Sequence, residues 1–164
     1  PTYDVLKSIK AKNISKNFEL GISVSFGHTL TYQKFLPETE QLIYSLANEL
    51  GQENISIICH DRADYDYATL RFPEIHRCIP RSFEEIYYEY KRCKGILSFR
   101  GHGIVFAAAL NLRCSPVLLC DKIESLYKYH YSQQPPKLNF EHGVHLNYLG
   151  KMFFPLDLSK NIKL

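Results

Sequence analysis

The stretch Gly95–Cys120 reads GILSFRGHGIVFAAALNLRCSPVLLC and contains a strand–helix–strand unit. Gly95–Phe99 is almost continuously apolar, which predicts a strand covered on both faces. Ile104–Leu110 includes three consecutive alanines, so we expect a compact helix that lies close to the sheet. Pro116–Cys120 predicts the next strand. The two strands of this unit therefore run parallel, joined through the turn Arg100–Gly103 and the helix.

The same alternation of strand and helix runs through the rest of the chain. A first strand is expected at Leu20–Ser25, and the following helix opens at Pro37 and ends at Gly51. The other expected elements are a strand at Ile55–Cys59, a helical stretch at Asp66–Leu70, a strand at Ile75–Ile79, a helix at Phe83–Arg92 with a capping box of Ser82 and Glu85, and a helix through Leu126 and Tyr129. This order predicts an α/β fold: a single lobe with a Rossmann-like parallel sheet of about five strands, wound by helices.

The length of 164 residues fits one domain. We expect a Lys-rich N-terminal linker or helix at residues 1–17, the Rossmann-like domain at 18–134, and a tail at 135–164 that packs on the domain. The chain begins at Pro1 without an initiator Met, so a processed product, a cut piece and a renumbered piece are all open alternatives.

Charge and cysteine content narrow the class of protein. The net charge of +3 is small and the basic residues are scattered, so nucleic acid is not an expected partner. The five cysteines form no CxxC pair and several lie in apolar runs, which indicates reduced thiols and a cytoplasmic protein. We find no signal peptide and no apolar run long enough for a transmembrane segment.

Ligands of parallel α/β sheets bind beyond the carboxyl ends of the strands, where the turn Arg100–Gly103 is expected. Gly101 and Gly103 allow a close approach of the backbone, and the helix that follows offers unpaired N–H groups to an anion. Arg100 adds a guanidinium and His102 a titratable donor. The open alternative is that Arg100 pairs with a structural acid and the glycines only make a tight turn.

Three further side chains are candidates for ligand binding. His60 stands beside Asp61 at the end of a strand, although an Asp there also caps a following turn. His28 follows the first strand, as a ligand contact or a loop residue. Lys122 follows the strand at Pro116–Cys120. No metal is expected. A zinc site usually has a close Cys or His pair in each half, and this chain has only one close histidine pair, His142 and His145, and no CxxC. No cofactor is expected either, because nucleotide fingerprints are absent.

The run Lys94–Lys122 resembles the polysaccharide pyruvyl transferase family. Members carry a strand, an Arg-x-His turn, an Ala-rich helix, a Pro-led strand and a Lys shortly after it; the likeness extends over roughly residues 18–130. The middle position is Gly101 here, where the family usually has an apolar residue such as Leu. The resemblance implies the C-terminal lobe of a two-lobed, GT-B-like transferase that moves a pyruvyl group from phosphoenolpyruvate onto a glycan acceptor.

By this resemblance Arg100 binds the phosphate or carboxylate of the anionic donor. His102 is a donor-binding or general-acid group, and Lys122 is a supporting cation. The chain supplies one lobe, so the acceptor-binding half is expected from an N-terminal lobe or a homo-oligomer.

Two other functions remain open. One is a GT-B-type glycosyltransferase lobe that binds a nucleotide-sugar. The other is a non-catalytic sensor or interaction domain, in which the aromatic helix Phe83–Tyr90 and the tail Met152–Phe154 form a partner surface.

Overall fold

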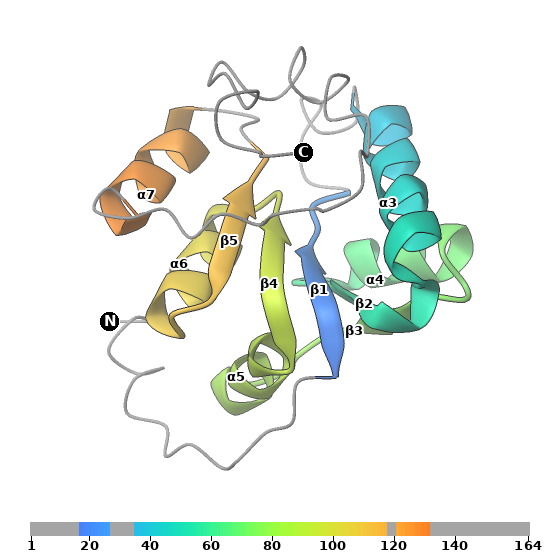
Figure 1. Cartoon of the computed structure of the whole chain (residues 1–164), viewed down its shortest axis with the longest axis horizontal. Helices are drawn as coiled ribbons and strands as arrows, with labels where there is room; N and C mark the ends of the chain where they lie inside the picture. Colours follow the sequence, from blue (N-terminus) through green and yellow to red (C-terminus); the bar gives the residue numbers. More distant parts are fainter. Residues whose placement is uncertain (1–16, 27–34, 118–120, 132–164) are drawn as a thin grey trace.

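The computed structural model describes residues 17–26, 35–117 and 121–131, and Figure 1 shows their arrangement. In chain order the elements are β1 (Phe18–Ser23), α3 (Leu36–Leu50), the short 3-10 helix η1 (Gln52–Asn54), β2 (Ile55–Ile58), α4 (Arg62–Arg71), β3 (His76–Cys78), α5 (Phe83–Lys91), β4 (Cys93–Ser98), α6 (Gly101–Ala109), β5 (Arg113–Pro116) and α7 (Asp121–Tyr131).

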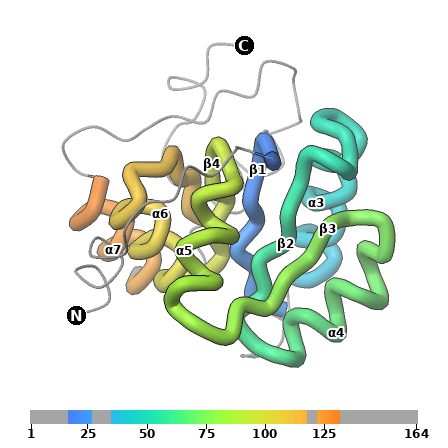
Figure 2. The backbone as a smooth tube through the Cα atoms, turned by 90° about the horizontal axis from the view of Figure 1, so that it is seen from below, coloured from blue at the N-terminus to red at the C-terminus, as the bar shows by residue number. Residues whose placement is uncertain are grey.

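The five described strands form one sheet in the order β3-β2-β1-β4-β5, and every pair of neighbours is parallel. The predicted α/β class, with a Rossmann-like parallel sheet of five strands, is therefore confirmed. The central strand β1 pairs with β2 on one side and β4 on the other, so the chain winds outward to β3 and then returns to β4. Figure 2 shows α4 beside β3, at the far end of the sheet from α6 and α7.

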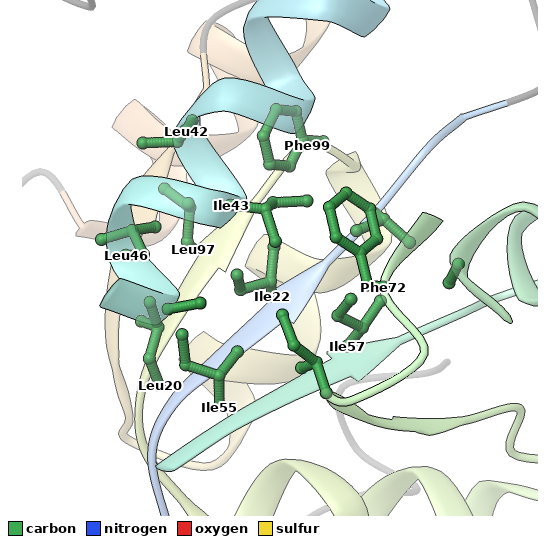
Figure 3. Close-up of a cluster of buried hydrophobic side chains, with 14 of the residues drawn as sticks. Leu20, Ile22, Leu42, Ile43, Leu46, Ile55, Ile57, Phe72, Leu97 and Phe99 are labelled. Atoms are coloured by element: carbon green, nitrogen blue, oxygen red, sulfur yellow. The ribbon is translucent and has the colours of Figure 1, made fainter. Parts of the chain in front are cut away.

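One face of the sheet is covered by α3 and α4. The apolar residues of α3 recur at helical spacing, so Leu42, Ile43 and Leu46 point together toward the sheet. They pack on Leu20 and Ile22 of β1, as Figure 3 shows. All five side chains are buried and belong to the hydrophobic core on that face.

The other face is covered by α5 and α6. Tyr87 and Tyr90 of α5 are buried there together with Ile104 and Phe106 of α6. The aromatic face of α5 thus belongs to the core, and Phe83 is the one aromatic residue of the helix that is markedly exposed, at 47%. The other half of that surface, Met152–Phe154, lies outside the described residues.

Helix boundaries follow the predicted signals at three places. Ser82 Oγ accepts a hydrogen bond from Glu85 N at 3.1 Å, as expected for a capping box. Gly51 ends α3 with a positive φ of 87°, a conformation that favours glycine. Asp61 is the N-cap of α4, and its carboxylate accepts a hydrogen bond from Asp64 N at 2.9 Å. With this cap the helix begins at Arg62, earlier than the predicted helical stretch at Asp66–Leu70.

Several boundaries differ from the prediction, and those of α6 and β5 bear on the site. α6 begins at Gly101 rather than Ile104, so most of the expected turn is the first turn of the helix. β5 spans Arg113–Pro116, because its pairing with β4 begins at Arg113; the predicted strand began at Pro116. Residues 118–120 lie outside the described part, as do the predicted N-terminal segment up to residue 16 and the tail from residue 132.

Two expectations about the class of protein concern the described residues as a whole. No helix among them is both long and apolar enough to cross a bilayer. Cys59, which directly follows β2, and Cys114, which lies in β5, are buried free thiols.

Candidate functional site

The candidate site lies where β1 and β4 end beside each other. The chain leaves β1 toward β2 on one side and leaves β4 toward β5 on the other, so the connections diverge at this point of the sheet. Such a divergence, the topological switch point, leaves a crevice beyond the strand ends in which α/β proteins bind ligands. Ser23 and Ser98 are the last residues of the two strands, are paired in register, and are both fully buried.

Gly103 brings the first turn of α6 directly onto these two serines. A Cβ at Gly103 would lie 2.2 Å from Ser98 Oγ and 2.5 Å from Ser23 Oγ, closer than real Cβ atoms approach. Only glycine therefore allows this contact between helix and sheet. The close approach places the N-terminus of α6 at the switch point rather than above it.

Within the described part of the chain, the N-terminus of α6 has no side-chain cap. Arg100 is the N-cap residue and its side chain makes no capping hydrogen bond. Ser98 instead holds the backbone of Arg100, accepting from its N–H at 3.3 Å and donating to its carbonyl at 2.8 Å. The N–H groups of Gly101, His102 and Gly103 precede the first residue that can bond within an α-helix, so they carry the positive end of the helix dipole.

The Arg100 guanidinium is held by protein acceptors. Nη2 donates to Asp61 Oδ2 at 2.6 Å and to Asp64 Oδ2 at 2.5 Å, while Nε donates to the Val24 carbonyl at 2.6 Å. The side chain is 16% exposed and that of Asp64 is 0% exposed. This arrangement matches the alternative in which Arg100 pairs with structural acids. It joins the ends of β1 and β4 to the start of α4.

Asp64 is the buried centre of this cluster. Its Oδ1 accepts from Phe26 N at 2.7 Å, and Oδ2 receives the Arg100 contact. Burial raises the pKa of the Asp64 carboxyl, and the Phe26 N–H and the Arg100 charge act against that rise. The carboxyl therefore depends on both partners to stay ionised in the interior.

His60 lies across the end of β1 in a network of hydroxyl groups. Its Nε2 is 3.0 Å from Ser23 Oγ and 3.1 Å from Tyr90 Oη. The ring lies parallel to that of Phe106, with centroids 6.0 Å apart. Burial, reinforced by the charge of Arg100, lowers the pKa of His60 to about 3, so the imidazole is neutral at physiological pH. In either tautomer the ring links β1 to α5 through a hydroxyl.

His102 is the exposed member of the histidine pair. It lies in the first turn of α6, and its ring centroid is 6.5 Å from that of His60 and 6.4 Å from that of Phe106. The structure thus brings two predicted site residues, His60 and His102, to one place. Of the two, His102 presents its ring to solvent above the switch point.

Lys122 and Gly101 lie on the side of the site that is next to α7. Lys122 lies in the first turn of α7 and is exposed. A Cβ at Gly101 would lie 2.6 Å from Leu126 Cδ1, so α7 packs against the start of α6. The contact is with the end of a flexible side chain, so it does not by itself require glycine at this position. His28 lies outside the described residues.

Several residues of the site were not predicted from the sequence. They are Ser23, Asp64, Tyr90, Ser98 and Phe106. Ser23 and Ser98 carried a signal, a small polar residue at the end of an otherwise apolar strand. Asp64 carried another, because an Asp three residues after an N-cap Asp is typical of a helix start. Tyr90 and Phe106 have the sequence pattern of ordinary core aromatics. No feature of the neighbouring sequence indicates that they belong to the site.

Among the described residues, the arrangement offers a helix end that suits an anion but no activated nucleophile. Ser23 contacts His60, yet Ser23 is fully buried and a His60 pKa of about 3 makes the imidazole a weak base. In the part of the chain that the structure describes, the groups available to a ligand are the N-terminal N–H groups of α6, the His102 ring and Lys122. Comparison with protein-family models, with curated proteins and with solved structures finds no match to this chain.

Proposed function

We propose that this domain binds an anionic small molecule, such as phosphoenolpyruvate, at the switch point, as the donor-binding lobe of a pyruvyl-transferase-like enzyme. One observation carries the proposal: the uncapped first turn of α6 lies directly on Ser23 and Ser98, since Gly103 has no Cβ. Its N–H groups therefore point into the crevice where α/β proteins bind phosphate and carboxylate groups. The resemblance of Lys94–Lys122 to the family supports the choice of donor.

The roles of the residues follow from their surroundings. The N–H groups of the α6 first turn and Lys122 bind the negative groups of the donor. His102, exposed above them, donates a proton or a hydrogen bond during transfer. Arg100 positions the loop before α6, because Asp61 and Asp64 already bind its Nη2. His60 supports the site as a neutral ring.

The contacts described at the switch point do not define a binding site for the glycan acceptor. We propose that a second lobe or a second copy of the chain supplies it. We also propose a cytoplasmic location, in keeping with the reduced thiols of Cys59, Cys78 and Cys114.

Calorimetric titration of the full chain with phosphoenolpyruvate tests the proposal. His102→Gln and Lys122→Gln each remove one ligand-facing group from an exposed position, so both leave the fold intact. We expect each to weaken binding about tenfold, the worth of a hydrogen bond to a charged group. His130→Gln and Lys128→Gln, which change α7 away from the switch point, are the matched controls and should bind like the wild-type protein.

The result also distinguishes the alternatives. Absence of phosphoenolpyruvate binding, or binding that both site variants retain, contradicts the proposal. Protection from heat by a uridine or cytidine nucleotide, without protection by phosphoenolpyruvate, favours a glycosyltransferase lobe instead. A tight oligomer in sedimentation that binds neither ligand favours the interaction domain. Weak binding without turnover supports a detached donor lobe.

A further inference from the structure

A second cluster of chemically active side chains lies at the edge of the sheet, between β3 and α5. His76 and Cys78 stand two residues apart on β3 and so project from the same face of the strand. Glu89, in the last turns of α5, faces them. One ligand atom from each residue, an imidazole nitrogen, a thiol sulfur and a carboxylate oxygen, lies within 4.8 Å of the other two.

Contacts from neighbouring side chains orient this cluster. The His76 ring stacks on Phe18, with centroids 4.9 Å apart and an interplanar angle of 23°. Glu89 accepts from Arg92 Nη1 at 3.3 and 3.4 Å, and its Oε2 lies 3.9 Å from His76 Nε2. The carboxylate is thereby directed toward β3. Arg92 itself lies over the Phe18 ring, so the same aromatic side chain supports two members of the cluster.

The Cys78 thiol makes polar contacts with Glu89 and with the Ile57 carbonyl. Its Sγ is 3.8 Å from the Ile57 carbonyl, the long limit of a sulfur hydrogen bond. Burial and the charge of Glu89 raise the pKa of Cys78. A bound divalent cation reverses this balance, because a coordinating thiol loses its proton.

The donor set matches one class of metal ion. Thiolate, imidazole and carboxylate together are ligands of zinc and similar borderline-soft ions, whereas calcium and magnesium take oxygen ligands. In a tetrahedral zinc site with ligands at about 2.0 to 2.3 Å, donor atoms are about 3.5 Å apart. The cluster therefore needs a contraction of about 1 Å. The exposed His76 side chain can provide it by rotation.

We propose that His76, Cys78 and Glu89 bind a zinc-like divalent metal ion with three protein ligands and one open position. Two negative ligands, the thiolate and the carboxylate, balance the charge of the ion beside the Arg92 cation. The site shares α5 with the switch point, where Tyr90 contacts His60, but it shares no side chain with it. It is independent of the proposed anion site.

Cobalt binding to the full chain provides the test, because a thiolate ligand gives an intense cobalt charge-transfer band. We expect the wild-type protein to show this band and visible bands of tetrahedral cobalt, and zinc to displace both. His76→Gln, Cys78→Ser and Glu89→Gln should each lower the affinity at least about tenfold. Cys114→Ala, which removes a buried thiol from β5 at the other edge of the sheet, and His102→Gln should leave it unchanged.

Three results would overturn the proposal. The first is a wild-type spectrum without the thiolate band. The second is a band that all three variants retain, since other cysteines and histidines of the chain would then bind the cobalt. The third is a band that only Cys78→Ser removes, which would exclude the other two ligands. His76→Gln alters an exposed side chain, so it tests the site even if Cys78→Ser does not fold.

Discussion

Arg100 Nη2 lies 2.5 Å from Asp64 Oδ2, which joins the N-cap of α6 to a fully buried carboxyl group of α4. Removal of one partner from such a pair leaves an uncompensated charge in the interior. We therefore expect Arg100→Ala to lower the free energy of unfolding by about 3 kcal/mol, measured by urea denaturation.

The double variant Arg100→Ala/Asp64→Asn is the control for this prediction. It removes both charges, so it should be less destabilised than the sum of the single variants. Additive single effects, or a loss below about 1 kcal/mol for Arg100→Ala, would show that the pair contributes little.

Gly103→Ala should destabilise the domain by about 2 kcal/mol, the typical cost of an overpacked contact. The new Cβ meets two buried hydroxyl oxygens at the ends of β1 and β4, and neither strand end can move freely. Gly101→Ala is the matched control, because its Cβ meets only the end of the flexible Leu126 side chain. Thermal unfolding of the two variants should separate them, and equal midpoints would contradict the close approach of α6 to the sheet.

His60 should make the folded state less stable as the pH falls. The pKa of His60 is lowered to about 3 by burial, whereas the unfolded chain protonates near 6.5. Between these values the unfolded state binds the extra proton, so stability declines from about pH 6.5 downward. Urea unfolding between pH 7.5 and 4.5 should show a steeper decline for the wild-type protein than for His60→Gln. An NMR titration in which the His60 ring protonates near pH 6.5 would exclude this explanation.

Glu40 should also make the folded state less stable as the pH falls, but in a more acidic range than His60. Its carboxylate accepts from Arg71 at 2.6 and 2.7 Å and from the Tyr67 hydroxyl, and the hydrogen bonds of Arg71 lower the pKa of Glu40 against the effect of burial. A lowered folded pKa gives stability that is present above the ordinary value of 4.5 and is lost as the pH falls through the folded value.

The measurement is the stability difference between wild-type protein and Glu40→Gln as a function of pH. The difference should favour the wild type at pH 7 and shrink below about pH 4.5. A difference that stays constant down to the acid transition would mean that Glu40 stabilises by packing alone.

The comparison between sequence and structure is clearest at α6. The apolar run, the glycines and the alanines predicted a strand, a close turn and a helix, and all three are present. The start of the helix was placed three residues late, because Gly101–Gly103 was read as a turn. Two glycines weaken the local helix signal, and packing on Ser23, Ser98 and Leu126 offsets that cost.

The candidate site was predictable in position but not in its contacts. Because parallel strands end at one edge of a sheet, the sequence already placed His60 and Arg100–Gly103 on the same side. It did not reveal that Arg100 binds Asp64, a residue 36 positions away, or that His60 contacts Tyr90. The same limit applies to Glu89, which meets His76 and Cys78 only through the packing of α5 on β3.

The sequence by itself determined the alternation of strands and helices, the capping of α5 by Ser82 and the glycines around His102. These features depend on periodicity and on contacts within a few residues. Tertiary structure decided the partner of the Arg100 charge, the pKa of His60 and the convergence of three possible metal ligands. The strand order and the packing of the helices on the sheet set those distances, and no local pattern encodes them.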